Sequence, residues 1–109
     1  MNHPAEILTV AGIAHHRRGR FLKPPGGTYA VWSDDVTTDG PDGLPPCIFS
    51  HDVELEVYEP QPDDAALEAL EATMGAAGLH WTRQDRFWIQ SDKMYQTIYT
   101  YSYIEKRRN

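Results

Sequence analysis

The sequence predicts one α+β domain: a four-stranded, mostly antiparallel sheet in the order α-β-β-α-β-β, with its helices packed on one face. Three segments lead to this expectation. Residues 52–57 alternate polar and apolar side chains, as a strand with one buried face does. Residues 63–77 carry apolar side chains at helical spacing. Residues 94–104 alternate again and are rich in tyrosine, a residue that favours strands.

The chain is expected to begin with a short helix and a loop. Residues 4–12 predict the helix, because Pro4 suits a first helical turn and Gly12 suits a helix end. Residues 13–27 predict a basic loop. This loop closes on Pro24-Pro25-Gly26-Gly27, a run that cannot sit in a helix and that marks a sharp entry to the next element.

Two strands separated by a long loop are expected next. Residues 28–33 are rich in strand-favouring side chains and predict the first strand. Residues 34–46 predict a long acidic loop, because aspartate, glycine and proline dominate them. Residues 47–58 predict the second strand. Its core-facing side chains are expected to be Val53, Leu55 and Val57, and its open face to carry Asp52, Glu54 and Glu56.

The second half of the chain predicts a helix and two further strands. Residues 63–77 form the helix, with Asp63 at its N-terminal cap and Gly78 just beyond its end. Residues 79–90 predict an interrupted strand, and residues 94–104 the last strand. The core-facing residues are expected to be Leu67, Leu70, Met74 and Ala77 in the helix, and Tyr95, Thr97, Tyr99, Tyr101 and Tyr103 in the last strand.

The formal net charge of −6 argues against general nucleic-acid binding, because phosphates attract a cationic surface. The charge is uneven: residues 15–20 and the short tail 105–109 are basic, whereas residues 34–71 carry most of the acid. Such polarity suits a protein that stacks or forms rings with charged neighbours, and the alternative is two solvated basic ends. We expect no signal peptide, no membrane span and, with Cys47 alone, a reducing compartment.

The sequence contains no motif of a known catalytic or cofactor site. A metal site built from His15, His16 and Asp34 is conceivable, although nothing in the spacing demands it. Ser50-His51-Asp52 contains the residue types of a hydrolase triad, but consecutive strand residues point to opposite faces and cannot converge. We therefore expect no enzyme activity, no cofactor and no metal.

One segment resembles a known family. Residues 88–99, Trp-Ile-Gln-Ser-Asp-Lys-Met-Tyr-Gln-Thr-Ile-Tyr, are similar to the ending Y-I-E-S-E-K-M-Y-x-x-x-Y of small phage and prophage tail-completion proteins, which are tail terminator-like and act in head–tail joining. Pro24-Pro25 resembles the family's entry to its first strand, residues 54–58 its second strand, and residues 64–71 its middle helix. The resemblance spans residues 24–103. The alternative interpretation of the first segment is a well-formed hairpin turn and nothing more.

The resemblance implies a single tail-completion domain over residues 1–109 and a structural, non-catalytic role in a virion. A protein of this family caps the tail tube and joins it to the head connector as an oligomeric ring, expected to be a hexamer. The implied partners are copies of itself, the tail-tube protein and the connector proteins. The implied location is the tail or neck of the virion, after assembly in the host cytoplasm. Contact with DNA is limited to passive contact with the molecule passing through the ring.

Assembly contacts are expected from the basic segment, the acidic loop, the turn before the last strand and the open face of that strand. These candidate interface residues are Arg17, Arg18, Arg20, Asp39, Asp42, Asp92, Lys93, Ile98 and Ile104. The loop 34–46 is longer than the resemblance predicts, and the basic residues 15–20 are unusual for it. The competing hypothesis is a monomeric α+β interaction module, an inhibitor or adaptor of a host protein, that uses the acidic strand face.

Overall fold

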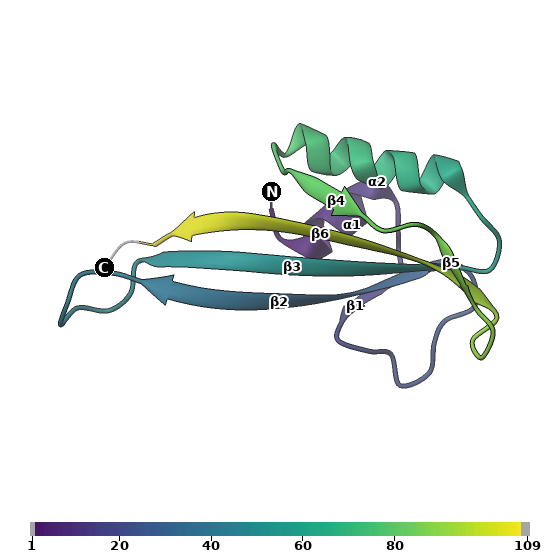
Figure 1. Cartoon of the computed structure of the whole chain (residues 1–109), viewed down its shortest axis with the longest axis horizontal. Helices are drawn as coiled ribbons and strands as arrows, with labels where there is room; N and C mark the ends of the chain where they lie inside the picture. The colour runs from purple at the N-terminus through teal and green to yellow at the C-terminus, as the bar shows by residue number, and fades with distance from the viewer. Residues whose placement is uncertain (1, 108–109) are drawn as a thin grey trace.

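The computed structural model describes residues 2–107 and has an α+β fold in which two helices lie on one face of a mixed sheet (Figure 1). In chain order the elements are α1 (Pro4–Ala11), β1 (His16–Arg18), β2 (Tyr29–Asp39), β3 (Ile48–Glu59), α2 (Asp64–Ala76), β4 (Trp81–Arg83), β5 (Phe87–Ile89) and β6 (Met94–Lys106). The fold class is as predicted, but the described residues form six strands and not four.

The sheet is built around β3, which pairs in antiparallel fashion with β2 on one side and β6 on the other. The strand order is β1-β2-β3-β6-β4, and β5 pairs with the other end of β6. The interrupted strand predicted over residues 79–90 is therefore two short strands, β4 and β5, which pair with different parts of β6.

The predicted basic loop 13–27 contains a strand that the sequence does not suggest. β1 pairs in parallel with β2, so that Arg17 lies opposite Val31. Two backbone hydrogen bonds flank this pairing: Gly19 donates to the Trp32 carbonyl at 2.8 Å, and Ala30 donates to the His15 carbonyl at 2.9 Å. A His-Arg-Arg segment has no apolar alternation, so only the free edge of β2 makes it a strand.

The predicted acidic loop 34–46 is wrong in its first half. Residues 34–39 continue β2 and pair with β3 up to Asp39, which lies opposite Ile48. The connection is the turn at residues 40–47, closed by a 3.1 Å hydrogen bond from the Cys47 amide to the Asp39 carbonyl. Backbone pairing along a neighbouring strand thus outweighs the low strand propensity of aspartate.

The core lies between the helices and one face of the sheet, as the alternation predicted. Its buried side chains include Leu67, Leu70 and Met74 of α2, Val53, Leu55 and Val57 of β3, and Thr97, Tyr99 and Tyr101 of β6. Both predicted helix ends are confirmed: Gly12 and Gly78 adopt positive φ angles of 93° and 78°, and Asp63 accepts a hydrogen bond from the Ala66 amide. Of the predicted tail 105–109, residues 105 and 106 belong to β6, and Arg108 and Asn109 lie outside the described residues.

The sheet extends well past the helices. The molecule measures 51 × 30 × 22 Å, and the helices cover only one half of its long axis (Figure 1). We call the uncovered half the arm: residues 33–39 of β2, 48–52 of β3 and 102–106 of β6, joined at the tip by the turn 40–47. A sheet of three strands with no helical cover exposes both faces and both edges to solvent or to a partner.

Candidate assembly surfaces

A cluster of polar side chains lies on the helix-side face of the arm, around His51. The imidazole Nδ1 is 2.8 Å from Asp34 Oδ2 on β2, and Nε2 is 3.0 Å from Glu105 Oε1 on β6. His51 is buried and stacks on Tyr103, with ring centroids 4.3 Å apart. The histidine therefore joins all three strands of the arm through its two ring nitrogens.

The cluster continues to the end of β6. Arg107 donates two hydrogen bonds to Glu105, from Nε at 3.1 Å and from Nη2 at 3.0 Å, and its guanidinium lies 3.8 Å from the ring centroid of Phe49. The Arg107 amide also donates to the Cys47 carbonyl at 2.8 Å. The basic end of β6 is thus attached to the arm by a bidentate pair and a cation–π contact.

The charges of the arm cluster favour a protonated His51. Burial opposes the charged imidazolium, but the hydrogen bonds to Asp34 and Glu105, together with their negative charges, outweigh it and raise the pKa of His51. The hydrogen bonds from Arg107 and His51 lower the pKa of Glu105. The arm is therefore stabilised most where His51 is charged and Glu105 is ionised.

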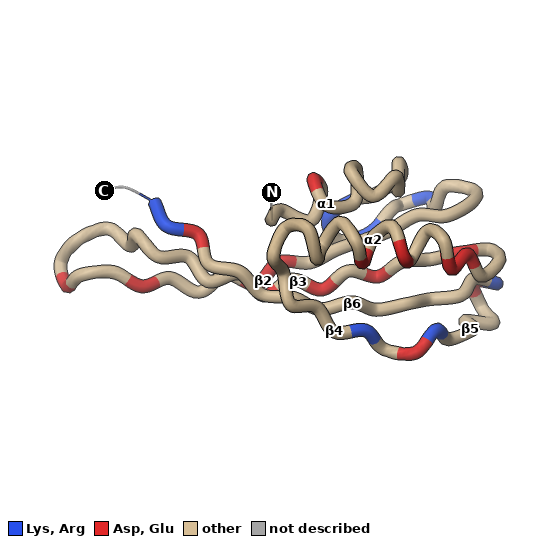
Figure 2. The backbone as a smooth tube through the Cα atoms, turned by 90° about the horizontal axis from the view of Figure 1, so that it is seen from above, with Lys and Arg blue, Asp and Glu red and all other residues tan. Residues whose placement is uncertain are grey.

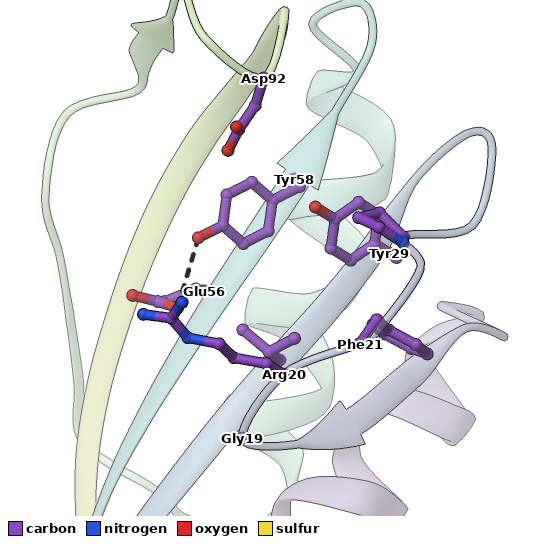
Figure 3. A pocket seen from close by; sticks show the side chains of 9 residues that line it. Gly19, Arg20, Phe21, Tyr29, Glu56, Tyr58 and Asp92 are labelled. Carbon is purple, nitrogen blue, oxygen red and sulfur yellow. Dashed lines mark hydrogen bonds between the residues drawn. The ribbon is translucent and has the colours of Figure 1, made fainter.

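A shallow hollow of about 330 Å³ lies on the opposite face of the sheet, between the strands and the loop that follows β1 (Figure 3). Its floor is formed by Tyr29 and Tyr58, which stack at 4.9 Å, and Phe21 closes one side with its ring edge toward Tyr29. Arg20 reaches over the sheet toward Glu56. Burial and the neighbouring Glu54 raise the pKa of Glu56, and the nearby Arg20 opposes that rise.

A buried carboxylate lies where β3 meets α2. The side chain of Glu59 is fully buried, and its Oε2 accepts a 3.0 Å hydrogen bond from the Asp63 amide at the start of the helix. Arg86 Nε lies 3.4 Å from Glu59 Oε1 without hydrogen-bond geometry. Burial raises the pKa of Glu59, while the charge of Arg86 opposes the rise. This pair attaches the segment between β4 and β5 to the helix-covered half.

The predicted interface residues fall into three groups. Asp39, Asp42 and Ile104 lie on the arm, and the Ile104 side chain is 62% exposed. Figure 2 shows acidic and basic residues on the arm. Arg17 and Arg18 lie on β1, where the Arg18 guanidinium lies 5.6 Å from the centroid of the Trp32 ring.

The remaining candidates lie near the hollow or on the open face of the sheet. Arg20 and Asp92 line the hollow of Figure 3, and Lys93 forms the β5–β6 turn with φ of 53°. Ile98 is half-buried on the open face.

The hypothetical metal site is not assembled. His16 Nε2 bonds to Thr9 Oγ1 at 2.9 Å, while Asp34 is paired with His51 in the arm. Within residues 2–107 there is no group of three or more histidine, cysteine, aspartate or glutamate side chains arranged to hold a metal ion. Asp34 and Glu105 bond to opposite sides of the His51 ring, so their oxygens do not converge.

The strand around His51 confirms that Ser50-His51-Asp52 cannot act as a triad. His51 faces the helix side with Tyr103, whereas Asp52 accepts a 2.6 Å hydrogen bond from Ser102 on the open face. Sequence reasoning dismissed this tripeptide correctly but missed the cluster that His51 does form. Its carboxylate partners are 17 and 54 residues away along the chain, and no local pattern indicates them.

No family model and no curated protein matches this chain. Among solved structures, a chain in the virion of a native gene transfer agent particle has a similar fold, with a TM-score of 0.58 and 16% sequence identity. The similarity covers 97% of this chain and 88% of that chain. No helix of the described part of the protein is long and apolar enough to cross a membrane.

Proposed function

We propose that this protein is a structural component of the virion of a tailed phage or prophage, or of a particle derived from one. The observation that carries the proposal is the fold similarity to a chain of the gene transfer agent virion, which extends over nearly the full length of both chains. The resemblance of residues 88–99 to tail-completion proteins points to the same class independently of the fold.

Within that class, we infer a role at the end of the tail tube: a ring, expected to be hexameric, that completes the tube and joins it to the head connector. The tapered shape supports this role, because an arm without helical cover leaves strand edges and both sheet faces available for neighbouring subunits. The buried polar side chains His51 and Glu59 each form hydrogen bonds to other groups of the fold, which favours assembly over catalysis.

Deletion of the gene in a strain that makes the particles provides the test. Loss of the protein is expected to leave heads and tails unjoined, or tails of abnormal length, in electron micrographs, and mass spectrometry of wild-type particles is expected to detect the protein. Complementation with the wild-type gene is the control. Normal particles from the deletion strain, together with no protein in wild-type particles, contradict the proposal.

A monomeric interaction module remains the second candidate, and one observation favours it. Asp35 and Asp52 lie directly opposite each other on the open face, next to Glu54, and like charges in that arrangement destabilise a sheet unless a cation covers them. On this hypothesis a basic surface of a host protein binds there. Asp52→Asn with Glu54→Gln would then abolish capture of a host protein without changing particle morphology.

A further inference from the structure

The two edges of the arm carry backbone groups that no strand pairs within the described chain. β1 covers β2 only at residues 30–32, and β4 covers β6 only at residues 99–101. Residues 33–39 of β2 and 102–106 of β6 therefore form open edges. Proteins normally protect such edges with proline, bulges, short length or charged side chains. Neither segment contains a proline, and the charged side chains that both carry still allow pairing with an edge of opposite charge.

The existing hydrogen bonds show which backbone groups point outward. The Trp32 carbonyl accepts from Gly19 on the outer side of β2, and the Ile98 carbonyl accepts from Gln84 on the outer side of β6. The backbone N–H and C=O groups of successive residues point to opposite sides of a strand. The groups that point outward on the arm therefore belong to even-numbered residues. On β2 they are those of Asp34, Val36 and Thr38, and on β6 those of Ser102, Ile104 and Lys106.

The charges left without an ion pair on the two edges are opposite, because Asp34 and Glu105 bond to His51 and Arg107 bonds to Glu105. Asp35 and Asp39 lie along the β2 edge, and Lys106 lies at the end of the β6 edge, followed by Arg107. Asp39 and Lys106 occupy one row of the sheet, with Ile48 between them. Neither forms an ion pair within residues 2–107. An acidic edge and a basic edge on one subunit fit each other on adjacent copies, as a head-to-tail contact requires.

We propose that the β2 edge of the arm, residues 33–39, pairs with the β6 edge, residues 102–106, of a second copy of this chain. This inference rests on the proposed ring and names the contact that closes it. Both strands are antiparallel to β3, so they run in the same direction. Copies related by rotation about an axis along the strands therefore pair β2 and β6 in parallel, with Asp39 of one copy next to Lys106 of the next.

The taper of the sheet is compatible with this contact. At the level of Tyr99 the sheet is five strands wide, from β1 to β4, whereas the arm is three strands wide. If neighbouring subunits touch along both the arm and the five-stranded region, their long axes must spread apart toward the five-stranded region. A ring of such wedges is a funnel, narrow at the arms and wide at the helix-covered halves, and the arm edges line its narrow part.

A disulfide trap tests the predicted row. In a Cys47→Ser background, Asp39→Cys and Lys106→Cys place two thiols on one row. Within one chain β3 separates them by roughly 10 Å between Cα atoms, too far for a disulfide, whereas in paired copies they lie about 5 Å apart. Oxidation of purified particles is expected to give a ladder of covalent oligomers. Asp35→Cys with Lys106→Cys removes the same number of charges but is four residues out of row, and we expect at least tenfold less cross-linking.

An edge proline gives a second test. Val36→Pro removes an outward N–H and leaves the bonds between β2 and β3 intact, so the monomer should fold with an unchanged circular dichroism spectrum while incorporation into particles falls at least tenfold. Val36→Thr is the matched control and should incorporate normally. Particles that contain the protein but give no ladder, with Val36→Pro incorporated as well as wild type, overturn the edge pairing and leave the proposed function standing. Particles without the protein overturn both.

Discussion

The imidazole ring of His51 lies flat against the phenol ring of Tyr103, with centroids 4.3 Å apart and planes 4° from parallel. The two residues are directly opposite each other on β3 and β6, and the start of α1 lines the same hollow as they do. Tyr103 also packs against the main core, so the stacked pair and the carboxylates on either side of the histidine extend that core into the arm.

This arrangement predicts a pH dependence of stability. The pKa of His51 is raised in the folded protein, so folding favours its protonated form. Its contribution is complete below the unfolded-state pKa, about 6.5, and is lost as pH rises through the folded pKa. Wild-type melting temperatures measured from pH 5.5 to 8.5 should fall more steeply than those of His51→Gln. Equal slopes in the two proteins would contradict the prediction.

The buried Glu59 predicts a large effect of removing its partner. Arg86→Ala leaves the carboxylate without a compensating charge and should lower the free energy of unfolding by about 3 kcal/mol at pH 7, the lower end for a broken buried pair because Arg86 is partly exposed. Urea unfolding measures the loss. In the Glu59→Gln background, where the side chain is neutral, the same substitution should cost less. Equal losses in both backgrounds would exclude an electrostatic role.

Tyr99 connects the sheet to α2. Its hydroxyl donates to Glu71 Oε2 at 2.6 Å, and Arg83 donates to the same oxygen at 2.7 Å. Tyr99→Phe removes the hydroxyl and should cost about 1.5 kcal/mol, the lower value for a hydrogen bond to a charged group. The urea midpoint should fall with an unchanged m-value. Tyr95→Phe removes a hydroxyl of the same strand that forms no hydrogen bond within residues 2–107 and serves as the control; a comparable shift there would contradict the assignment.

Two glycines near the end of α2 should respond in opposite directions. Gly75 lies within the helix, and a Cβ added there would meet open space, so Gly75→Ala should stabilise the protein by roughly 0.5–1 kcal/mol. Gly78 has φ of 78°, so Gly78→Ala should destabilise it by about 1 kcal/mol. Thermal unfolding of both variants provides the comparison. If both variants were stabilised, or both destabilised, backbone conformation would not explain the effect of replacing these glycines.

The sequence alone predicts those helices and strands in which apolar residues recur at a regular spacing. The stripe of Leu67, Leu70 and Met74 and the alternation around Leu55 each identify an element, its buried face and its ends, because burial of apolar side chains is the same local requirement in any fold. The turn at Ser91–Lys93 is predictable for a similar reason, since polar turn residues separate two strand-like segments.

The arm could not be predicted from the sequence, because its structure depends on strands that pair across the chain. Asp34–Asp39 have the composition of a loop and become a strand only beside β3, and β1 becomes one only beside β2. The partners of His51 come from both neighbouring strands, so the pairing register must be known before the cluster can be seen. Three of the candidate interface residues predicted from the sequence lie on the arm, although the sequence does not predict the arm itself.

β3 and β6 run without interruption from beneath α2 to the far end of the molecule. Each strand therefore acts as a mechanical link: a displacement imposed at the tip is carried along its backbone to the helices. In the proposed ring, a contact between the tip and a neighbouring subunit would therefore set the tilt of the whole subunit.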